Sequence, residues 1–143
     1  ICCMGIRTGT EAFEFKEIFP SAEVYGVDIT ELIKTIRTHL NIKIELQDFN
    51  NLPEDWEDKF DLVFSNSIDH AFEPEVTLRE WWRVTKAGGY LLVEFSTTPE
   101  NNIEHSFKYA DLSKLLPSDK FEHTIIWEAP ERNIIVGLFK VVK

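Results

Sequence analysis

This sequence of 143 residues has few cysteines, few cationic side chains and no long apolar run. No apolar run approaches the roughly twenty residues that a membrane span needs, and no signal peptide is visible. Lys and Arg number 15 against 25 Asp and Glu, which gives a formal net charge of −10. Because nucleic-acid binding depends on neutralising phosphates, this balance argues against a nucleic-acid partner. We therefore expect neither a membrane nor a nucleic acid as partner.

The only two cysteines are adjacent, Cys2 and Cys3. Neighbouring residues of a strand point to opposite faces of a sheet, so these thiols should diverge. We predict two small buried side chains, with no structural disulfide and no metal site. Free cysteines also favour a reduced, cytoplasmic setting.

The composition that is present is that of a folded domain. Hydrophobic residues make up 43% of the chain and aromatic residues 13%, which excludes a disordered chain. The length suits one domain, residues 1–143, with a sheet covered on both faces. Because the chain begins at Ile1 inside an expected strand, we also expect residues upstream of it.

Residues 1–28 contain the most informative pattern. An apolar run is followed by a turn with Gly5 and Gly9, an amphipathic segment that ends before Pro20, and a second apolar run that ends in Asp28. This order predicts a strand, a turn, a helix and a second strand. Free N–H groups at the helix start can dock polar ligand groups, and a carboxylate about twenty residues later can accept both ribose hydroxyls. The unit therefore predicts a site for a nucleoside-containing ligand.

The rest of the chain alternates between expected strands and helices. Helical spacing predicts buried stripes on the first two helices, the second capped by Thr30, and Gly88-Gly89 should end the helix that starts at Pro74. Residues 96–107 have no period and suit a functional lid. The two stripes are Ala12, Phe15, Ile18 and Phe19, and then Ile33, Ile36 and Leu40; later strands are expected at 42–46, 60–64, 90–95, 121–127 and 134–142, with a helical turn at Trp56 and a helix at 109–116.

The last two strands, residues 121–127 and 134–142, leave no room for a helix between them. They must form a hairpin, so the final strand is antiparallel. We therefore predict an α/β fold with a seven-stranded, mostly parallel sheet, helices on both faces and an antiparallel final strand.

Two segments carry a resemblance to a known family. Residues 60–70 read FDLVFSNSIDH, and residues 83–90 read RVTKAGGY. They are similar to the "FDLV…S…DH" stretch and the "RVLKPGG" turn of small-molecule, class I S-adenosylmethionine-dependent methyltransferases. The resemblance covers essentially the whole chain. It implies a Rossmann-like three-layer sandwich that transfers a methyl group from S-adenosylmethionine to a small-molecule acceptor.

The resemblance also implies roles for individual residues around the cofactor. It places Gly5 and Gly9 beneath the methionine portion, Asp28 on the ribose hydroxyls, Ile29 against the adenine, Asp48 on the adenine amino group, the Phe49 backbone on a ring nitrogen, and Ser65 and Asn66 on the methionine side at the mouth of the substrate pocket.

Two positions depart from the family pattern. The family usually has glycine at the position of Arg7 and a carboxylate at the position of Cys3. Glycine lets the backbone approach a ligand closely, so an arginine must swing away or fill the methionine subsite. A more positive site would favour a carboxylate or phosphate group. Alternatively, Arg7 simply pairs with a nearby carboxylate such as Glu11.

Histidine at position 70 is the candidate catalytic residue. His70 follows the fourth strand, where a base is useful for unmasking a nucleophile, and Asp69 is placed to orient it. The alternative is a histidine that only shapes its loop. His105, in the expected lid, is a weaker candidate. The aromatic residues Phe72, Phe107 and Tyr109 suit either the wall of an acceptor pocket or the core.

Two other functions stay open at this stage. A domain of the same fold that has lost its ligand through Arg7 and Cys3 would act as a scaffold. A nicotinamide-dependent dehydrogenase is disfavoured, because the glycine spacing lacks the dinucleotide pattern and the terminal hairpin suits a methyltransferase sheet better.

Overall fold

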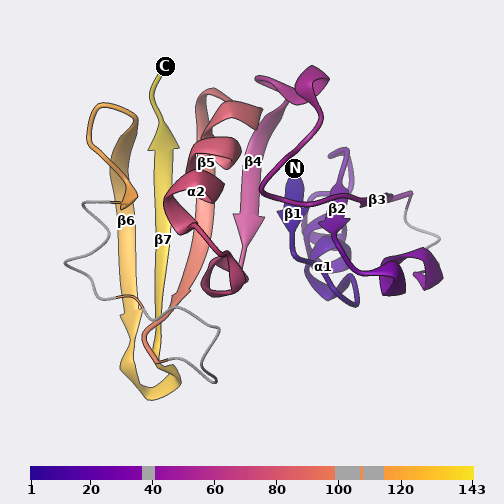
Figure 1. The fold of residues 1–143 in the computed structure, drawn as a ribbon, viewed down its shortest axis with the longest axis horizontal. Helices are drawn as coiled ribbons and strands as arrows, with labels where there is room; N and C mark the ends of the chain where they lie inside the picture. The colour runs from indigo at the N-terminus through magenta and orange to yellow at the C-terminus, as the bar shows by residue number, and fades with distance from the viewer. Residues whose placement is uncertain (37–40, 99–106, 108–114) are drawn as a thin grey trace.

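The computed structural model describes residues 1–36, 41–98, 107 and 115–143, which form one seven-stranded sheet with helices on both faces (Figure 1). The strand order is β3-β2-β1-β4-β5-β7-β6. The strands are β1 (Cys2–Met4), β2 (Tyr25–Asp28), β3 (Lys43–Leu46), β4 (Phe60–Ser65), β5 (Thr85–Ser96), β6 (Phe121–Ala129) and β7 (Ile134–Val141). The α-helices are α1 (Thr10–Ile18) and α2 (Pro74–Val84), and the 3₁₀ turns are η1 (Glu31–Thr35), η2 (Glu54–Trp56), η3 (Ile68–His70) and η4 (Pro130–Arg132).

The direction of the strands agrees with the expected fold class. Strands β1 to β5 pair in parallel, whereas β7 is antiparallel to both β5 and β6. The expected antiparallel final strand is therefore confirmed. The connection between β6 and β7 is not helix-free, since it contains η4 (Pro130–Arg132), but a single turn of three residues only closes the hairpin.

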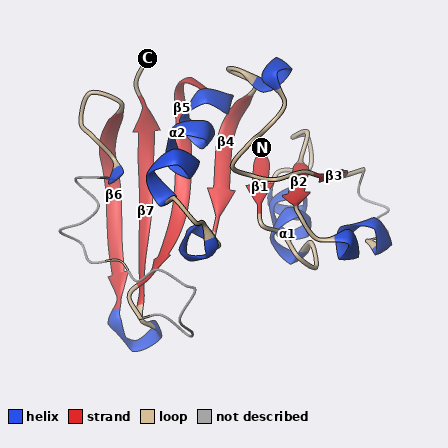
Figure 2. Ribbon diagram, viewed as in Figure 1, coloured by secondary structure: helices blue, strands red, loops and turns tan. Residues whose placement is uncertain are grey.

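Two separate apolar clusters lie on the two faces of the sheet. Trp81 and Leu78 of α2 pack on one face with the inward residues of β4, β5 and β7, while Ala12 of α1 packs on the other face (Figure 2). Cys2 belongs to the first cluster and Cys3 to the second, and both thiols are free and fully buried. The expected divergence of the two cysteines is confirmed, as are the three layers.

The stripe expected on α1 is only partly buried. Ala12 is inaccessible and Phe15 is half-buried, but Ile18 is 66% exposed and Phe19 is 47% exposed. The end of α1 therefore packs less closely on the sheet than its start does.

The helix expected after Thr30 is the 3₁₀ turn η1. The Thr30 side chain makes no capping hydrogen bond there, so its expected role as a cap is wrong. Ile33 is buried and Ile36 half-buried, as the stripe predicts, while Leu40 lies outside the described residues.

The end of α2 also differs from the expectation. The helix ends at Val84, and the glycine pair that was expected to end it lies inside β5, with Gly88 in a left-handed conformation (φ 75°). The last carbonyl groups of α2 are already satisfied, because the N–H groups of Asp58 and Lys59 donate to the Arg83 and Val84 carbonyls. No glycine cap is therefore needed at this helix end.

The expected lid and the helix at 109–116 fall largely outside the described residues, which leaves His105 and Tyr109 without a structural account. Phe107 is buried against Phe95, with ring centroids 5.4 Å apart, and belongs to the α2-side cluster. The expected turn at Trp56 is confirmed by η2. In the described part of the chain, no helix is long and apolar enough to cross a membrane.

Candidate functional site

A cleft of about 380 Å³ lies at the carboxyl ends of the central strands. The strand order changes direction between β1 and β4, and open α/β sheets bind ligands outside the carboxyl ends of strands at such a point. We call this hollow the first cleft. Its lining residues are Gly5, Arg7, Asp28, Ile29, Thr30, Asp48, Phe49, Asn50, Ser67, His70 and Phe72.

The turn between β1 and α1 forms the floor of the first cleft. Its backbone is left-handed at Gly5 (φ 73°), Arg7 (φ 44°) and Gly9 (φ 86°). A Cβ atom on Gly5 would lie 2.7 Å from both Cβ and Oγ of Ser67, so only glycine fits at that position. Gly9 does not line the cleft, because it precedes the first residue of α1 and packs near Ile36. Gly5 therefore shapes the floor, and Gly9 shapes the helix start.

Asp28 ties the end of β2 to this turn. Its Oδ2 accepts a hydrogen bond from the Arg7 N–H (2.7 Å), and its Oδ1 accepts one from the Thr30 N–H (2.8 Å). The residue is only 7% exposed, yet it lines the cleft. Each carboxylate oxygen can accept a further hydrogen bond. Asp28 is thus held rigidly and still presents two acceptors toward the cleft, as a pair of ribose hydroxyls requires.

Arg7 keeps the left-handed backbone of a glycine position while its side chain is exposed. Among the described residues its guanidinium has no ion pair and no hydrogen-bond partner. The alternative pairing with Glu11 is not found there, since Glu11 accepts a hydrogen bond from Asn66 Nδ2 (3.1 Å). Arg7 therefore places an unpaired cation at the edge of the first cleft.

Cys3 has no access to the first cleft. It lies fully buried with Ile6, Ala12 and Val24, and burial raises the pKa of its thiol to about 12. A carboxylate at this position would be surrounded by apolar side chains, which is costly without a partner. The family pattern has a carboxylate at this position. In this chain the position lies in the apolar core, so its loss does not change the charge of the residues that line the first cleft.

The loop after β3 supplies one acceptor and one donor from two consecutive residues, Asp48 and Phe49. Asp48 Oδ1 accepts two hydrogen bonds from Asn50, one from its N–H and one from its side-chain amide (both 2.8 Å). Asp48 Oδ2 and the Phe49 N–H have no hydrogen-bond partner in the described part of the chain. An adenine edge carries an amino donor beside a ring-nitrogen acceptor, so these two groups complement it.

Helix α2 holds this loop from behind. Trp81 Nε1 donates to the Phe49 carbonyl (3.1 Å), and its ring meets the Phe49 ring edge to face at 5.6 Å. Thr77 Oγ1 also donates to the Asn50 side chain. Trp81 is fully buried. Its polar N–H nonetheless fixes the loop that lines the first cleft.

An ion pair completes the support from α2. Glu80 Oε1 accepts from the Leu52 N–H (2.8 Å) and from Arg83 Nη2 (2.6 Å), and Arg83 Nη2 also donates to the Leu52 carbonyl (3.1 Å). Burial raises the pKa of the Glu80 carboxyl, but the hydrogen bonds from Arg83 and the Leu52 N–H outweigh it and hold this pKa below its usual value. The sequence contains no local signal for this support, because the helix and the loop are separate in the chain.

The walls of the first cleft are apolar and open to solvent. Ile29 is 67% exposed and Phe72 is 86% exposed, and both line the cleft. Such exposed apolar side chains suit contact with a flat ring. Ile29 is where the resemblance placed the adenine, and Phe72 was a candidate for an acceptor wall.

Ser65 and Asn66 do not line the first cleft. Ser65 is fully buried, donates from Oγ to the Met4 carbonyl (3.1 Å) and accepts from the Ser67 N–H (3.1 Å). Ser67 is the residue that reaches the cleft, and its Oγ donates to the Gly5 carbonyl (3.4 Å). The sequence reasoning missed Ser67, which lies two residues beyond the position that the family motif indicates.

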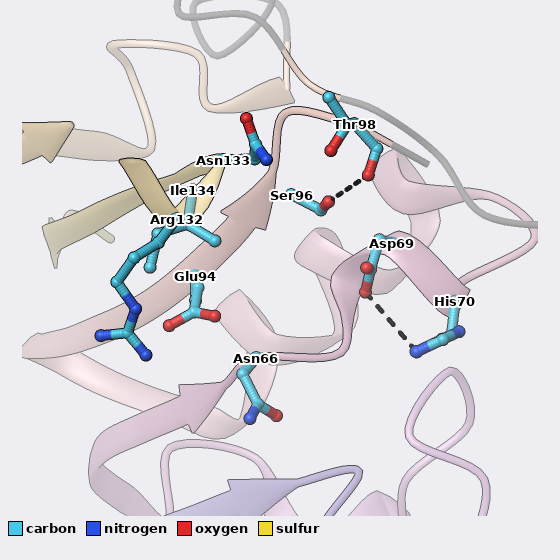
Figure 3. A pocket seen from close by; sticks show the side chains of 9 residues that line it. All are labelled: Asn66, Asp69, His70, Glu94, Ser96, Thr98, Arg132, Asn133 and Ile134. Atoms are coloured by element: carbon cyan, nitrogen blue, oxygen red, sulfur yellow. Dashed lines mark hydrogen bonds and ion pairs between the residues drawn. The ribbon is translucent and has the colours of Figure 1, made fainter. Parts of the chain in front are cut away.

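A second cleft of about 370 Å³ lies beyond the ends of β4 and β5 and beside the β6–β7 connection (Figure 3). Nearly all its lining side chains are polar, and four of them carry an ionisable group. Its lining residues are Asn66, Asp69, His70, Glu94, Ser96, Thr98, Arg132, Asn133 and Ile134. The sequence reasoning singled out Asn66, Asp69 and His70 among these, and missed Glu94 and Arg132, for which no local pattern exists.

His70 lines both clefts. Its side chain is half-exposed, and its Nε2 lies 3.9 Å from Asp69 Oδ1 (Figure 3). That distance is too long for a hydrogen bond but short enough for electrostatic contact. His70 is therefore placed between the two clefts.

Comparisons with known proteins agree with this geometry. A family model described as a methyltransferase domain matches residues 5–132. No curated protein matches the sequence. The chain resembles a solved complex between the Haloferax volcanii Trm112 methyltransferase activator and a methyltransferase, with a TM-score of 0.83, 16% identity and coverage of 99% of this chain and 82% of that chain.

Two further solved structures have the same fold. One is a SAM-dependent methyltransferase from Methanosarcina mazei, with a TM-score of 0.78 and 18% identity over 99% of this chain and 91% of that chain. The other is a SAM-dependent methyltransferase from Aquifex aeolicus, with a TM-score of 0.75 and 15% identity over 99% of this chain and 81% of that chain. At these identities the likeness concerns the fold.

Proposed function

The chain belongs to the methyltransferase domain family, among the class I S-adenosylmethionine-dependent methyltransferases, and from this we propose that it binds S-adenosylmethionine in the first cleft and methylates a small-molecule acceptor. The observation that carries the proposal is the juxtaposition of Asp28 with Asp48 and Phe49 around one cleft. Asp28 offers two acceptors for ribose, while Asp48 and the Phe49 N–H offer an acceptor and a donor for adenine.

The proposed binding roles follow the geometry. Gly5 lets the backbone approach the methionine portion, and Ser67 and Arg7 border it. Ile29 covers the adenine. In this proposal Gly9 and Ser65 act indirectly, through the helix start and through Ser67, and Asn66 belongs to the acceptor side, since none of these three lines the first cleft.

The bound cofactor supplies an electrophilic methyl group, so the protein mainly has to position an acceptor and remove its proton. We assign the base to His70, because it alone lines both clefts among the described residues. Asp69 is then a positioning residue, at 3.9 Å from the imidazole.

The hollow shape of the second cleft supports a small-molecule acceptor, since about 370 Å³ is in the range of small-ligand pockets. The net charge of −10 argues against a nucleic-acid substrate. The free, buried cysteines agree with a cytoplasmic location. We also propose that residues 1–143 form a single methyltransferase-like domain.

The test is binding of S-adenosylhomocysteine, measured by calorimetry and by the shift in thermal unfolding. A ligand that binds only the folded state raises its stability, by about 2.7 kcal/mol at a hundredfold excess over Kd. We expect saturable binding with one site. A correctly folded protein with no binding at millimolar ligand would instead support the scaffold alternative.

One observation favours that alternative, namely the unpaired cation of Arg7 at the edge of the cleft. We expect Arg7→Gly to tighten binding of S-adenosylhomocysteine, because glycine removes a long side chain from the edge of the cleft. Relief of left-handed backbone strain should appear separately, as a gain in stability of about 1 kcal/mol. Calorimetry on both proteins measures this. Weaker binding by Arg7→Gly would mean that the guanidinium holds the methionine carboxylate, and would strengthen the assignment of an active enzyme.

A second change that the family pattern suggests, Cys3→Asp, does not test the site. Its carboxylate would be buried among apolar side chains of the α1-side cluster, so we expect lower stability and not tighter binding.

A further inference from the structure

We propose that the acceptor that binds in the second cleft is a small zwitterionic molecule, whose ammonium group contacts Glu94 and whose acid group contacts Arg132. This inference rests on the proposed function, because it takes the second cleft as the acceptor site. It adds the chemical class of the acceptor, which the family and the fold leave open.

In the described structure the charges of Glu94 and Arg132 are both available to a ligand. Glu94 ends in the cleft from β5, and Arg132 reaches it from η4 (Figure 3). Within the described residues neither side chain has an ion pair or a hydrogen-bond partner, so they are not paired with each other. Two opposite charges that face one hollow without meeting are suited to a ligand that bridges them.

The environment of Glu94 favours a cationic group on the ligand. This side chain is half-buried at the end of a strand, and burial raises the pKa of its carboxyl, while Arg132 lowers it and Asp69 and Glu11 raise it further. A partly desolvated carboxylate beside other carboxylates is unfavourable without a cationic partner. A ligand ammonium group removes this penalty and forms a charge-assisted hydrogen bond.

Ligands with a single charge are disfavoured in this cleft. An amine without an acid group would satisfy Glu94 but would bring a cation near Arg132. An acid without an amine would satisfy Arg132 but would face the carboxylates of Glu94 and Asp69. Like charges at close range disfavour binding, so the cleft selects for both signs on one molecule.

The remaining lining agrees with a polar, hydroxyl-bearing or amide-bearing acceptor body. Asn66, Ser96 and Asn133 border the cleft, and Ile134 supplies an apolar edge. His70 is at the border with the first cleft, so the methylated group of the acceptor is the one that lies nearest to it.

The test uses the protein with bound S-adenosylhomocysteine and a panel of common amino acids. Each amino acid is compared with its decarboxylated amine and its deaminated acid, for example tyrosine with tyramine and 3-(4-hydroxyphenyl)propionate. Binding is measured by ligand-observed NMR and calorimetry. We expect binding to be confined to, or strongest for, zwitterions of the panel.

Two variants assign the charges. Glu94→Gln and Arg132→Gln should each weaken the best zwitterion by roughly tenfold or more, through loss of one charge-assisted contact. Glu94→Gln should improve the relative binding of the acid, and Arg132→Gln that of the amine. Glu122→Gln and Lys140→Gln, which change an exposed ion pair outside both clefts on the same hairpin, are the matched controls and should have no effect.

The outcomes are separable from those of the proposed function. Neither Glu94 nor Arg132 lines the first cleft, so S-adenosylhomocysteine affinity should be unchanged in both variants. If the protein binds S-adenosylhomocysteine but binds no zwitterion, or binds singly charged or neutral compounds equally well, the inference is overturned and the proposed function stands. If S-adenosylhomocysteine itself does not bind, the proposed function fails first.

Discussion

In the first cleft two of the polar groups that face a ligand, Asp28 and Asp48, are fixed by main-chain hydrogen bonds, whereas the second cleft is lined mainly by polar side chains from three separate segments. Asp28 is held by two backbone N–H groups, and Asp48 by a turn around Asn50. Glu94 and Arg132 have no such partners in the described structure. The first cleft therefore holds its acceptors in one geometry, while the second carries charges that no described residue pairs.

The difference suggests how the two hollows would evolve and respond to mutation. A cleft made of turns tolerates few changes, because each residue also maintains the fold. A cleft made of exposed side-chain ends can change its charges without loss of the fold.

The largest expected effect comes from removing the support behind the first cleft. Trp81→Ala should lower the free energy of unfolding by about 3–5 kcal/mol, since a fully buried indole leaves a cavity and the Phe49 carbonyl loses its donor. Chemical denaturation measures the loss. Trp82→Ala, at a half-buried neighbour, is the control and should cost clearly less. Equal losses would mean that the contact of Trp81 with the loop of Phe49 adds nothing beyond the burial of an ordinary tryptophan.

If Trp81→Ala does not fold, Trp81→Phe tests the same point more gently. It replaces the indole by a smaller aromatic ring and removes the donor to the Phe49 carbonyl, so about 1 kcal/mol for the hydrogen bond is lost together with part of the packing. We expect its affinity for S-adenosylhomocysteine to fall, because the loop that carries Asp48 is less firmly held.

The next effect tests the main-chain origin of the first cleft. Gly5→Ala should lower the free energy of unfolding by about 2–4 kcal/mol, through backbone strain and a 2.7 Å contact with Ser67. Gly88→Ala has a similar φ of 75° but open space around its Cβ, so it should cost only about 1 kcal/mol. Thermal and chemical unfolding of both variants would isolate the contact term; the same loss in both would show that the Ser67 contact relaxes freely.

Asp28→Ala should weaken S-adenosylhomocysteine binding by about 1–3 kcal/mol, because a pair of charge-assisted acceptors is removed. It should also reduce stability, since the Arg7 and Thr30 N–H groups lose their acceptor. Calorimetry at a temperature where both proteins are folded separates the two effects. As the control, Asp61→Ala removes an exposed carboxylate of β4 that pairs with Lys86 of β5, and it should leave the affinity unchanged. Unchanged affinity in Asp28→Ala would rule out its ribose role.

The smallest effect concerns the second cleft. Burial raises the pKa of the Glu94 carboxyl above its ordinary value of 4.5, so its protonated form is favoured in the folded protein and its ionised form lowers stability. The protonated Glu94 carboxyl carries no such penalty, so the folded protein keeps its full stability below pH 4.5 and loses part of it as the pH rises through the folded pKa of Glu94. Glu94→Gln should therefore raise Tm slightly at pH 7, and the difference should vanish in acid. A lower Tm at pH 7 would show that the ionised carboxylate already has a stabilising partner.

Much of the first cleft was predictable from the sequence. The turn with Gly5, the strand that ends in Asp28 and the pair Asp48 and Phe49 are read from short spacings, and the structure brings all four residues to one cleft. Three residues expected at the cofactor, Gly9, Ser65 and Asn66, do not line the first cleft. Ser67, one or two residues further along the chain than Asn66 and Ser65, lines it instead. Spacing fixes which segment meets the ligand, but side-chain direction depends on the packing of that segment.

The sequence by itself determined the order of the elements, the antiparallel last strand and the cofactor-side turn, because periodicity and turn chemistry depend on contiguous residues. Only the tertiary structure decided that α2 ends at Val84 and holds the loop of Phe49, and that Glu94 and Arg132 face one hollow. These arrangements depend on which strands are neighbours in the sheet. The order β4-β5-β7-β6 places the end of β5 beside the β6–β7 connection, and no local pattern carries that information.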